Sequence, residues 1–175
     1  MVKTKGMGIL IEKTQDCPYV NFSDEGILEI EGRSITEDPF TFWQPLLEWV
    51  EGYCQKPSPI TQVIIFLEYS NSSSNKYISE IFRKLEEIHG SKTQVSVQWR
   101  HEIEDDAILQ LGHDFASIFE LPFEFIGVDV EKERFKKVKI RSKKTGTEAI
   151  ISYRYWDAIV RNGHGDEYQI LQEFS

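Results

Sequence analysis

Three consecutive serines are the residues of this sequence with the clearest capacity for chemistry. Ser72, Ser73 and Ser74 lie in the stretch YSNSSSNKY at residues 69–77, between an apolar run and an amphipathic run. A cluster of hydroxyl groups could contain a catalytic nucleophile, bind a phosphate group, cap a helix, or accept a phosphoryl group from a kinase. The surrounding residues narrow these four possibilities.

Two of the possibilities lack their supporting motifs. A phosphate-binding P-loop needs GxxxxGK[ST], and the serine loop contains no glycine. A serine hydrolase needs a nucleophile elbow such as GxSxG, and nothing assigns one of the four histidines as its partner. We therefore expect no catalytic residues in this loop.

Two interpretations of the loop remain open on the residues alone. In one, a serine caps a helix and its neighbours are solvated turn residues. In the other, one serine accepts a phosphoryl group, which adds a charge of about −1.5 to −2 and is tolerated at a helix N-terminus.

The elements on either side explain why this loop is a plausible site. Residues 61–69 form an apolar run of strand length, rich in Val and Ile, as expected for a central strand. After the loop, five apolar residues fall on one face of a helix that ends at Gly90: Ile78, Ile81, Phe82, Leu85 and Ile88. The loop thus lies at the carboxyl end of a strand and the start of a helix, where open α/β sheets bind ligands.

The other elements predict an α/β fold with a mixed β-sheet and packed helices. Asp38 and Pro39 start a helix with Phe40 and Trp43 in its apolar stripe, and Pro45 predicts a kink or a late start. The expected elements are strands at 7–12, 18–23 and 27–31, a helix from Asp38 onward, a strand at 61–69, a helix that follows the serine loop and ends at Gly90, a strand at 94–99 and a helix after the acidic run. This order, β-β-β-α-β-α-β-α, ends near Ile126 and requires parallel crossovers.

The C-terminal quarter is chemically different. Residues 132–144 hold eight of the 20 Lys and Arg against one acid, so this window carries +7 and the rest of the chain −16. Two alternating runs around Thr145 and Gly146 predict a β-hairpin over residues 135–156, with Tyr153 and Tyr155 in its second strand. We expect two domains, 1–128 and a basic hairpin extension at 129–175.

The basic hairpin also supports an alternative function. Its cationic side chains could bind an anionic partner, either a nucleic acid or a membrane surface: Lys136, Lys137, Lys139, Arg141, Lys143 and Lys144. More often such a face is the solvated side of an added sheet. The net charge of −9 argues against general nucleic-acid binding.

Composition narrows the class of protein further. No apolar run approaches the roughly 20 residues of a membrane span, and the first residues do not resemble a signal peptide, so we expect a cytoplasmic protein. Cys17 and Cys54 are too few for a disulfide framework. The acidic run at 102–106 lacks calcium-loop spacing, so we expect a solvated helix start rather than a metal site. It would form an acidic surface near the serines if both loops share one sheet edge.

Four spaced segments resemble the SiaC-like family of regulatory phosphoproteins. The similarity runs from about Ile9 to Ile126 and does not extend to residues 129–175. The segments are TQDCPYVNF at 14–22, GILEIEGRSITEDPFTFWQPLLEWVEGY at 26–53, LEYSNSSSNKYISEIFRKL at 67–85 and VQWRHEIEDDAILQLGHDF at 97–115.

This resemblance implies a fold and a function. The family is similar in architecture to STAS-type anti-sigma-factor antagonists, and its members are not enzymes and need no cofactor. A hydroxyl residue is phosphorylated by a serine/threonine kinase of the anti-sigma-factor type and dephosphorylated by a PP2C-type phosphatase. The unmodified form engages an effector, in known cases a diguanylate cyclase.

Alignment with the family motif places the phosphate acceptor at Ser72. Serine replaces the usual threonine there, which makes Ser73 a competing acceptor, and Ser70 replaces an aromatic residue. The expected partner-binding residues are the serine loop and the nearby acids: Tyr69, Asn71, Ser72, Ser73, Ser74, Asn75, Lys76, Glu104, Asp105 and Asp106.

Overall fold

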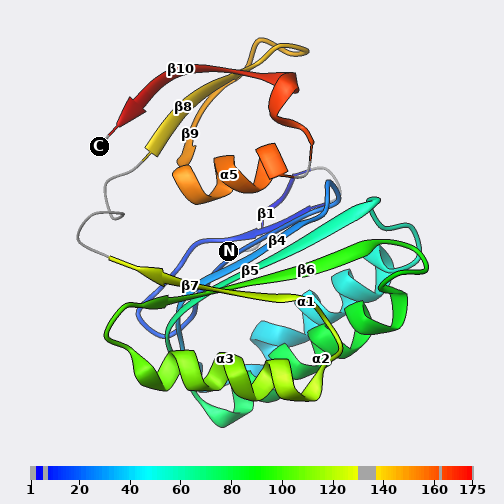
Figure 1. Ribbon diagram of the computed structural model, residues 1–175, viewed down its shortest axis with the longest axis vertical. Helices are drawn as coiled ribbons and strands as arrows, with labels where there is room; N and C mark the ends of the chain where they lie inside the picture. The colour runs from blue at the N-terminus through cyan, green and yellow to red at the C-terminus, as the bar shows by residue number, and fades with distance from the viewer. Residues whose placement is uncertain (1–2, 6–7, 130–136, 162, 175) are drawn as a thin grey trace. The chain divides into compact units, whose positions relative to one another are not determined.

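The computed structural model describes residues 3–5, 8–129, 137–161 and 163–174 (Figure 1). They divide into two compact units, Met1–Gly127 and Val128–Ser175, and each is considered by itself. One of the hairpin cations, Lys136, lies outside the described residues.

A mixed seven-stranded sheet forms the first unit, with its strands in chain order from edge to edge. The strands are β1 (Lys3–Lys5), β2 (Gly8–Ile11), β3 (Tyr19–Ser23), β4 (Ile27–Ser34), β5 (Ile60–Ser70), β6 (Gln94–Glu102) and β7 (Phe123–Val128). Strands β1 to β4 pair antiparallel, whereas β4, β5 and β6 pair parallel. The expected mixed sheet is confirmed, with β1 and β7 as strands that the residue pattern did not predict.

Three helices cover one face of this sheet (Figure 1). They are α1 (Pro39–Tyr53), α2 (Ser72–Ile88) and α3 (Asp106–Ile118), and each follows a parallel strand. Crossovers between parallel strands are almost always right-handed, and the strand order steps in one direction, so successive helices pack on the same side. The core between the two layers includes Phe22, Trp43, Phe82 and Trp99, all at most 1% exposed.

Side-chain caps determine where the three helices begin. The carboxylates of Asp38 and Asp105 and the side-chain oxygen of Asn71 each accept a backbone N–H from the first turn, at 3.1, 2.9 and 2.8 Å. Pro45 lies inside α1, which nevertheless starts at Pro39. A late start is therefore wrong, because the Asp38 cap and a proline at the first helical position already satisfy the helix N-terminus.

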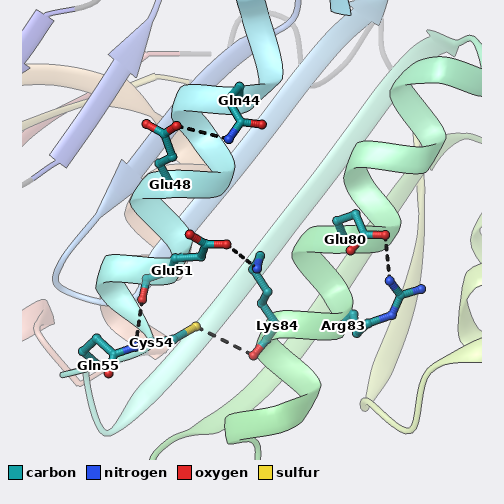
Figure 2. A network of polar contacts seen from close by, with 8 residues as sticks. All are labelled: Gln44, Glu48, Glu51, Cys54, Gln55, Glu80, Arg83 and Lys84. Carbon is teal, nitrogen blue, oxygen red and sulfur yellow. Dashed lines mark hydrogen bonds and ion pairs between the residues drawn. The ribbon is translucent and has the colours of Figure 1, made fainter. Parts of the chain in front are cut away.

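Polar contacts join α1 to α2 beside the apolar core (Figure 2). Lys84 Nζ lies 2.6 Å from Glu51 Oε1, and the Cys54 thiol donates to the Lys84 carbonyl oxygen at 3.7 Å. Trp43 of α1 also stacks on Tyr77 of α2, with ring centroids 6.1 Å apart. These contacts hold α2, and with it the serine loop at its N-terminus, against α1.

The two cysteines should react very differently in the folded protein. Cys54 is 7% exposed and its burial raises the pKa of the thiol, whereas Cys17 is partly exposed. Because the thiolate is the reactive form, we expect Ellman's reagent to label one thiol per chain rapidly and the second only after denaturation. A Cys17→Ser variant with no fast-reacting thiol is the matched control. Rapid labelling of that variant in native buffer would show that α1 does not bury Cys54.

The described part of the second unit contains a small three-stranded antiparallel sheet and an α-helix. Its strands are β8 (Lys137–Ser142), β9 (Glu148–Ser152) and β10 (Tyr168–Phe174), in the order β10-β8-β9. A helix, α5 (Tyr153–Arg161), and a short 3-10 helix, η1 (Gly165–Glu167), precede β10. The predicted hairpin of β8 and β9 is confirmed, and Gly146 in its turn has a φ of +72°, which favours glycine.

The predicted second strand of the hairpin is too long. It ends at Ser152, and Tyr153 and Tyr155 belong to α5. Trp156 and Ile159 lie on one side of this helix and are at most 9% exposed, like Val138 and Ile140 of β8. The helical spacing of this apolar pair outweighs the alternation of the tyrosines, because it buries a tryptophan and an isoleucine together.

Candidate functional site

The serine loop and the acidic run lie at the same edge of the sheet. Ser34, the last residue of β4, pairs with Ser70, the last residue of β5. In the same parallel arrangement Phe66 of β5 pairs with Arg100 of β6, so the loops after β5 and β6 leave the sheet side by side. The condition for an acidic surface near the serines is therefore met.

The three serines are not equivalent. Asn71 is the N-cap of α2, and Ser72 and Ser73, the first two residues of the helix, are exposed to solvent. Ser74 is completely buried, with 0% of its surface exposed. Two hydroxyl groups are thus accessible to another protein and the third is not.

Ser74 makes a pair of hydrogen bonds with a residue of β4. The Ser34 hydroxyl donates to Ser74 Oγ at 2.7 Å, and the Ser74 hydroxyl donates to the Ser34 carbonyl oxygen at 3.1 Å. Ser74 was expected among the partner-binding residues, but it lies on the buried stripe of α2, four residues before Ile78. It is not part of the accessible surface, and Ser34 is a residue of the site that the pattern did not reveal.

Large apolar side chains are exposed around the accessible serines. Tyr69, at the end of β5, is 52% exposed, and the guanidinium of Arg33 lies 6.0 Å from its ring centroid. Phe40 in the first turn of α1 and Ile103 after β6 are 63% and 62% exposed. Exposed aromatic and aliphatic groups of this size are typical anchors of protein interfaces.

Two of these three side chains were not expected at the site. Phe40 was placed in the buried stripe of α1, and this is wrong because the stripe starts at Trp43, one turn into the helix. Ile103 lies between acidic residues, and apart from this position among charges nothing in the sequence indicated that it belongs to the site. Tyr69 was expected, and a register shift between β4 and β5 beside Arg33 accompanies its outward position.

The acidic residues divide into a helix cap and exposed charges. Asp105 caps α3 through the bond to Ile108, whereas Glu104 and Asp106 are exposed. Within the described ranges, no three His, Cys, Asp or Glu side chains gather in a way that could hold a metal ion. The acids therefore contribute negative charge to the edge that carries Ser72.

Acidic groups neutralise part of the basic hairpin. Lys139 Nζ lies 2.7 Å from one carboxylate oxygen of Glu148, and Arg141 binds the other. These hydrogen bonds lower the pKa of Glu148. Lys143 donates to the carbonyl oxygen of Asp166 at 2.8 Å. Glu148 therefore offsets part of the positive charge of Lys139 and Arg141, whereas Lys143 keeps its charge while it donates to a neutral carbonyl.

A family model described as SiaC family regulatory phosphoprotein matches residues 11–128. This chain belongs to the SiaC family. The match begins in β2, ends at the last residue of β7 and includes the serine loop, Ser34 and the acidic run. Residues 129–175 lie outside the matched range.

Solved structures of a SiaC protein share this fold. The crystal structure of apo-SiaC from Pseudomonas aeruginosa is 27% identical, covers 67% of this chain and 97% of its own, and has a TM-score of 0.63. The crystal structure of the diguanylate cyclase SiaD in complex with its activator SiaC, from the same organism, matches at 26% identity and a TM-score of 0.64, over 68% of this chain and 98% of that one.

A relative found by sequence, from P. aeruginosa strain UCBPP-PA14, matches this chain to a similar extent. This uncharacterised protein is 26% identical over 114 residues, which are 65% of this chain and 90% of the relative. None of the described helices is both long and apolar enough to span a membrane. The family model thus covers most of the first unit, and these relatives match about two thirds of this chain.

Proposed function

We propose that this SiaC-family chain is a cytoplasmic, non-enzymatic switch protein that is reversibly phosphorylated on Ser72. The observation that carries the proposal is the accessibility of Ser72 at the first position of α2, on an edge that also exposes Tyr69, Phe40 and Ile103. A kinase can reach this hydroxyl, and an effector that contacts the same edge would meet the phosphate.

Phosphorylation at this position changes the surface without threatening the fold. The phosphate stands beside the N-terminal N–H groups of α2, where the helix dipole stabilises a negative charge by about 0.3–1 kcal/mol. Lys76 follows one helical turn later, in reach of a favourable pair with the phosphate. The added charge of about −1.5 to −2 joins the exposed Glu104 and Asp106, so the edge becomes strongly anionic.

The partners follow from the family. We propose a serine/threonine kinase of the anti-sigma-factor type, a PP2C-type phosphatase, and an effector of the diguanylate cyclase class that binds the unmodified form. The proposal of a cyclase is supported by the relative whose structure is described as a complex of the cyclase SiaD with its activator SiaC. The partner surface comprises the accessible members of the expected set: Tyr69, Asn71, Ser72, Ser73, Asn75, Lys76, Glu104, Asp105 and Asp106.

Intact-mass analysis with the cognate kinase and ATP tests the acceptor. We expect one phosphate on the wild-type protein and on Ser73→Ala, and a loss of at least about tenfold in rate for Ser72→Ala, because the nucleophilic oxygen is missing. Peptide mapping locates the phosphate. Equal phosphorylation of Ser72→Ala and wild type would refute the assignment of Ser72 as the phosphate acceptor. A loss only in Ser73→Ala would assign the acceptor to Ser73 instead.

The basic hairpin offers less support for the alternative role as an adaptor for an anionic partner. Lys139 and Arg141 share Glu148, and Lys143 binds a backbone carbonyl, so a polyanion would have to compete with these contacts. Nucleic-acid binding by this face would weaken steeply with salt. The accessible serine edge therefore remains the better-supported site.

A further inference from the structure

Ser34 and Ser74 form a buried link between β4 and the start of α2. Both residues have 0% of their surface exposed, and they are 40 positions apart in the sequence. The Ser34 hydroxyl donates to Ser74 Oγ at 2.7 Å, and Ser74 Oγ donates back to the Ser34 carbonyl oxygen at 3.1 Å. Ser74 Oγ thus both donates and accepts within the protein interior.

The carbonyl group of Ser34 also binds the residue that precedes Ser72. The backbone N–H of Asn71 donates to the Ser34 oxygen at 3.0 Å. Asn71 in turn accepts from the Ser74 backbone N–H at 2.8 Å through its side chain. Ser72 and Ser73 therefore lie between two residues that are both hydrogen-bonded to Ser34. These bonds fix the backbone from which the two exposed side chains project.

We propose that the Ser34–Ser74 link selects the hydroxyl that is phosphorylated. It withholds Ser74 from the kinase and positions the exposed segment so that Ser72 is presented. Ser34 is a positioning residue in this scheme, because it acts through Asn71 and Ser74 rather than by touching the phosphate. The inference rests on the proposed phosphorylation of this loop.

The chemistry of phosphoryl transfer explains the selection. A bond forms between the serine oxygen and the γ-phosphorus of ATP, the bond from that phosphorus to the ADP oxygen breaks, and the hydroxyl proton leaves to a base of the kinase. The attacking oxygen must approach in line with the breaking bond. Ser74 Oγ cannot do so without losing both hydrogen bonds and the packing around it, whereas Ser72 needs no such rearrangement.

Phosphate mapping on four proteins tests this inference with the cognate kinase and ATP. They are the wild type, Ser72→Ala/Ser73→Ala, Ser34→Ala and the control Ser79→Ala, which truncates a serine farther along the same helix. The double variant keeps Ser74 as its sole serine in the triplet, so it measures how well the buried hydroxyl is withheld. Ser34→Ala removes the donor to Ser74 and leaves all three candidate hydroxyls in place.

The expected results separate the two roles of the link. The double variant should be phosphorylated at Ser74 at least about fivefold more slowly than the wild type is at Ser72. In Ser34→Ala, the ratio of phosphate on Ser72 to phosphate on Ser73 and Ser74 should fall by about fivefold, because the loss of one hydrogen bond supplies a factor of that size. Ser79→Ala should match the wild type. An unchanged ratio in Ser34→Ala, or rapid modification of Ser74 in the double variant, overturns the inference.

Amide hydrogen exchange on the unmodified wild type provides a readout that needs no kinase and no variant. The amides of Asn71 and Ser74 should be protected at least about tenfold relative to those of Ser72 and Ser73, which precede the hydrogen-bond ladder of the helix. Equal exchange at all four positions would show that neither the Asn71–Ser34 nor the Ser74–Asn71 hydrogen bond fixes this segment, and would overturn the positioning on which the inference depends. A wild-type protein that exchanges as expected but accepts no phosphate would instead contradict the proposed function and the selective role together, while leaving the link itself intact.

Discussion

Replacing Tyr69 with alanine is expected to weaken binding to the proposed effector, a diguanylate cyclase, by about tenfold to a hundredfold, or ~1–3 kcal/mol. The ring is 52% exposed at the end of β5 and lies near the Arg33 guanidinium, so a partner on this edge would bury it beside a cation. Tyrosine is among the residues that contribute most to interfaces, because its large ring loses little conformational entropy on binding. Isothermal titration calorimetry with the unphosphorylated protein measures the change.

Ile118→Ala is the matched control for Tyr69→Ala. Ile118 is 65% exposed, but it ends α3, a helix that starts at the serine edge and therefore finishes at the opposite end of the sheet. Both substitutions remove an exposed apolar side chain, and only one removes it from the proposed interface. Equal affinities of wild type and Tyr69→Ala, or equal losses in both variants, would place the effector elsewhere on the chain.

A Gly112→Ala substitution is expected to lower the free energy of unfolding of the first unit by about 1–3 kcal/mol. A Cβ atom at position 112 would lie 2.5 Å from two atoms of the Trp99 ring, closer than real contacts allow. Trp99 is fully buried and its indole N–H donates to the Ile108 carbonyl oxygen at 2.9 Å, so a shift of the ring would disturb both its packing and this hydrogen bond. Urea unfolding followed by circular dichroism measures the loss.

Replacing Gly52 with alanine should instead raise the free energy of unfolding. Gly52 lies in α1, and a Cβ atom there would meet nothing within 4 Å. Alanine should therefore stabilise the helix by about 0.5–1 kcal/mol, because it costs less backbone entropy than glycine. A destabilised Gly52→Ala, or a Gly112→Ala as stable as the wild type, would contradict the packing of α1 or of α3 described above.

The regular elements of the first unit could be predicted because their periodicity reflects burial. The stripe from Ile78 to Ile88 identified α2, and the apolar run at 61–69 identified β5, since a strand covered on both faces needs no alternation. The short strands β1 and β7 were missed. β1 has three residues, and β7 mixes exposed, half-buried and buried positions, so neither has a distinctive pattern.

Predictions failed where one pattern was compatible with two structures. Tyr153 and Tyr155 alternate like strand residues, and the burial of Trp156 and Ile159 places them in a helix instead. Phe40 has the correct spacing for the stripe of α1, but it lies in the first turn and is 63% exposed, so the covering layer does not extend over it. Spacing along the chain indicates which residues share a face, and not how far the covering layer extends.

By itself, the sequence determined the family, the mixed α/β architecture and the position of the serine loop between a central strand and a helix. These properties depend on local periodicity, capping residues and motif order, all of which can be read along the chain. Only the tertiary structure distinguished the three neighbouring serines. Ser74 continues the buried stripe of α2 one turn before Ile78, but the residue that satisfies its hydroxyl, Ser34, ends another strand 40 positions away, and that contact leaves no local pattern. Ser72 and Ser73, in the same first turn, are exposed and leave two accessible hydroxyl groups.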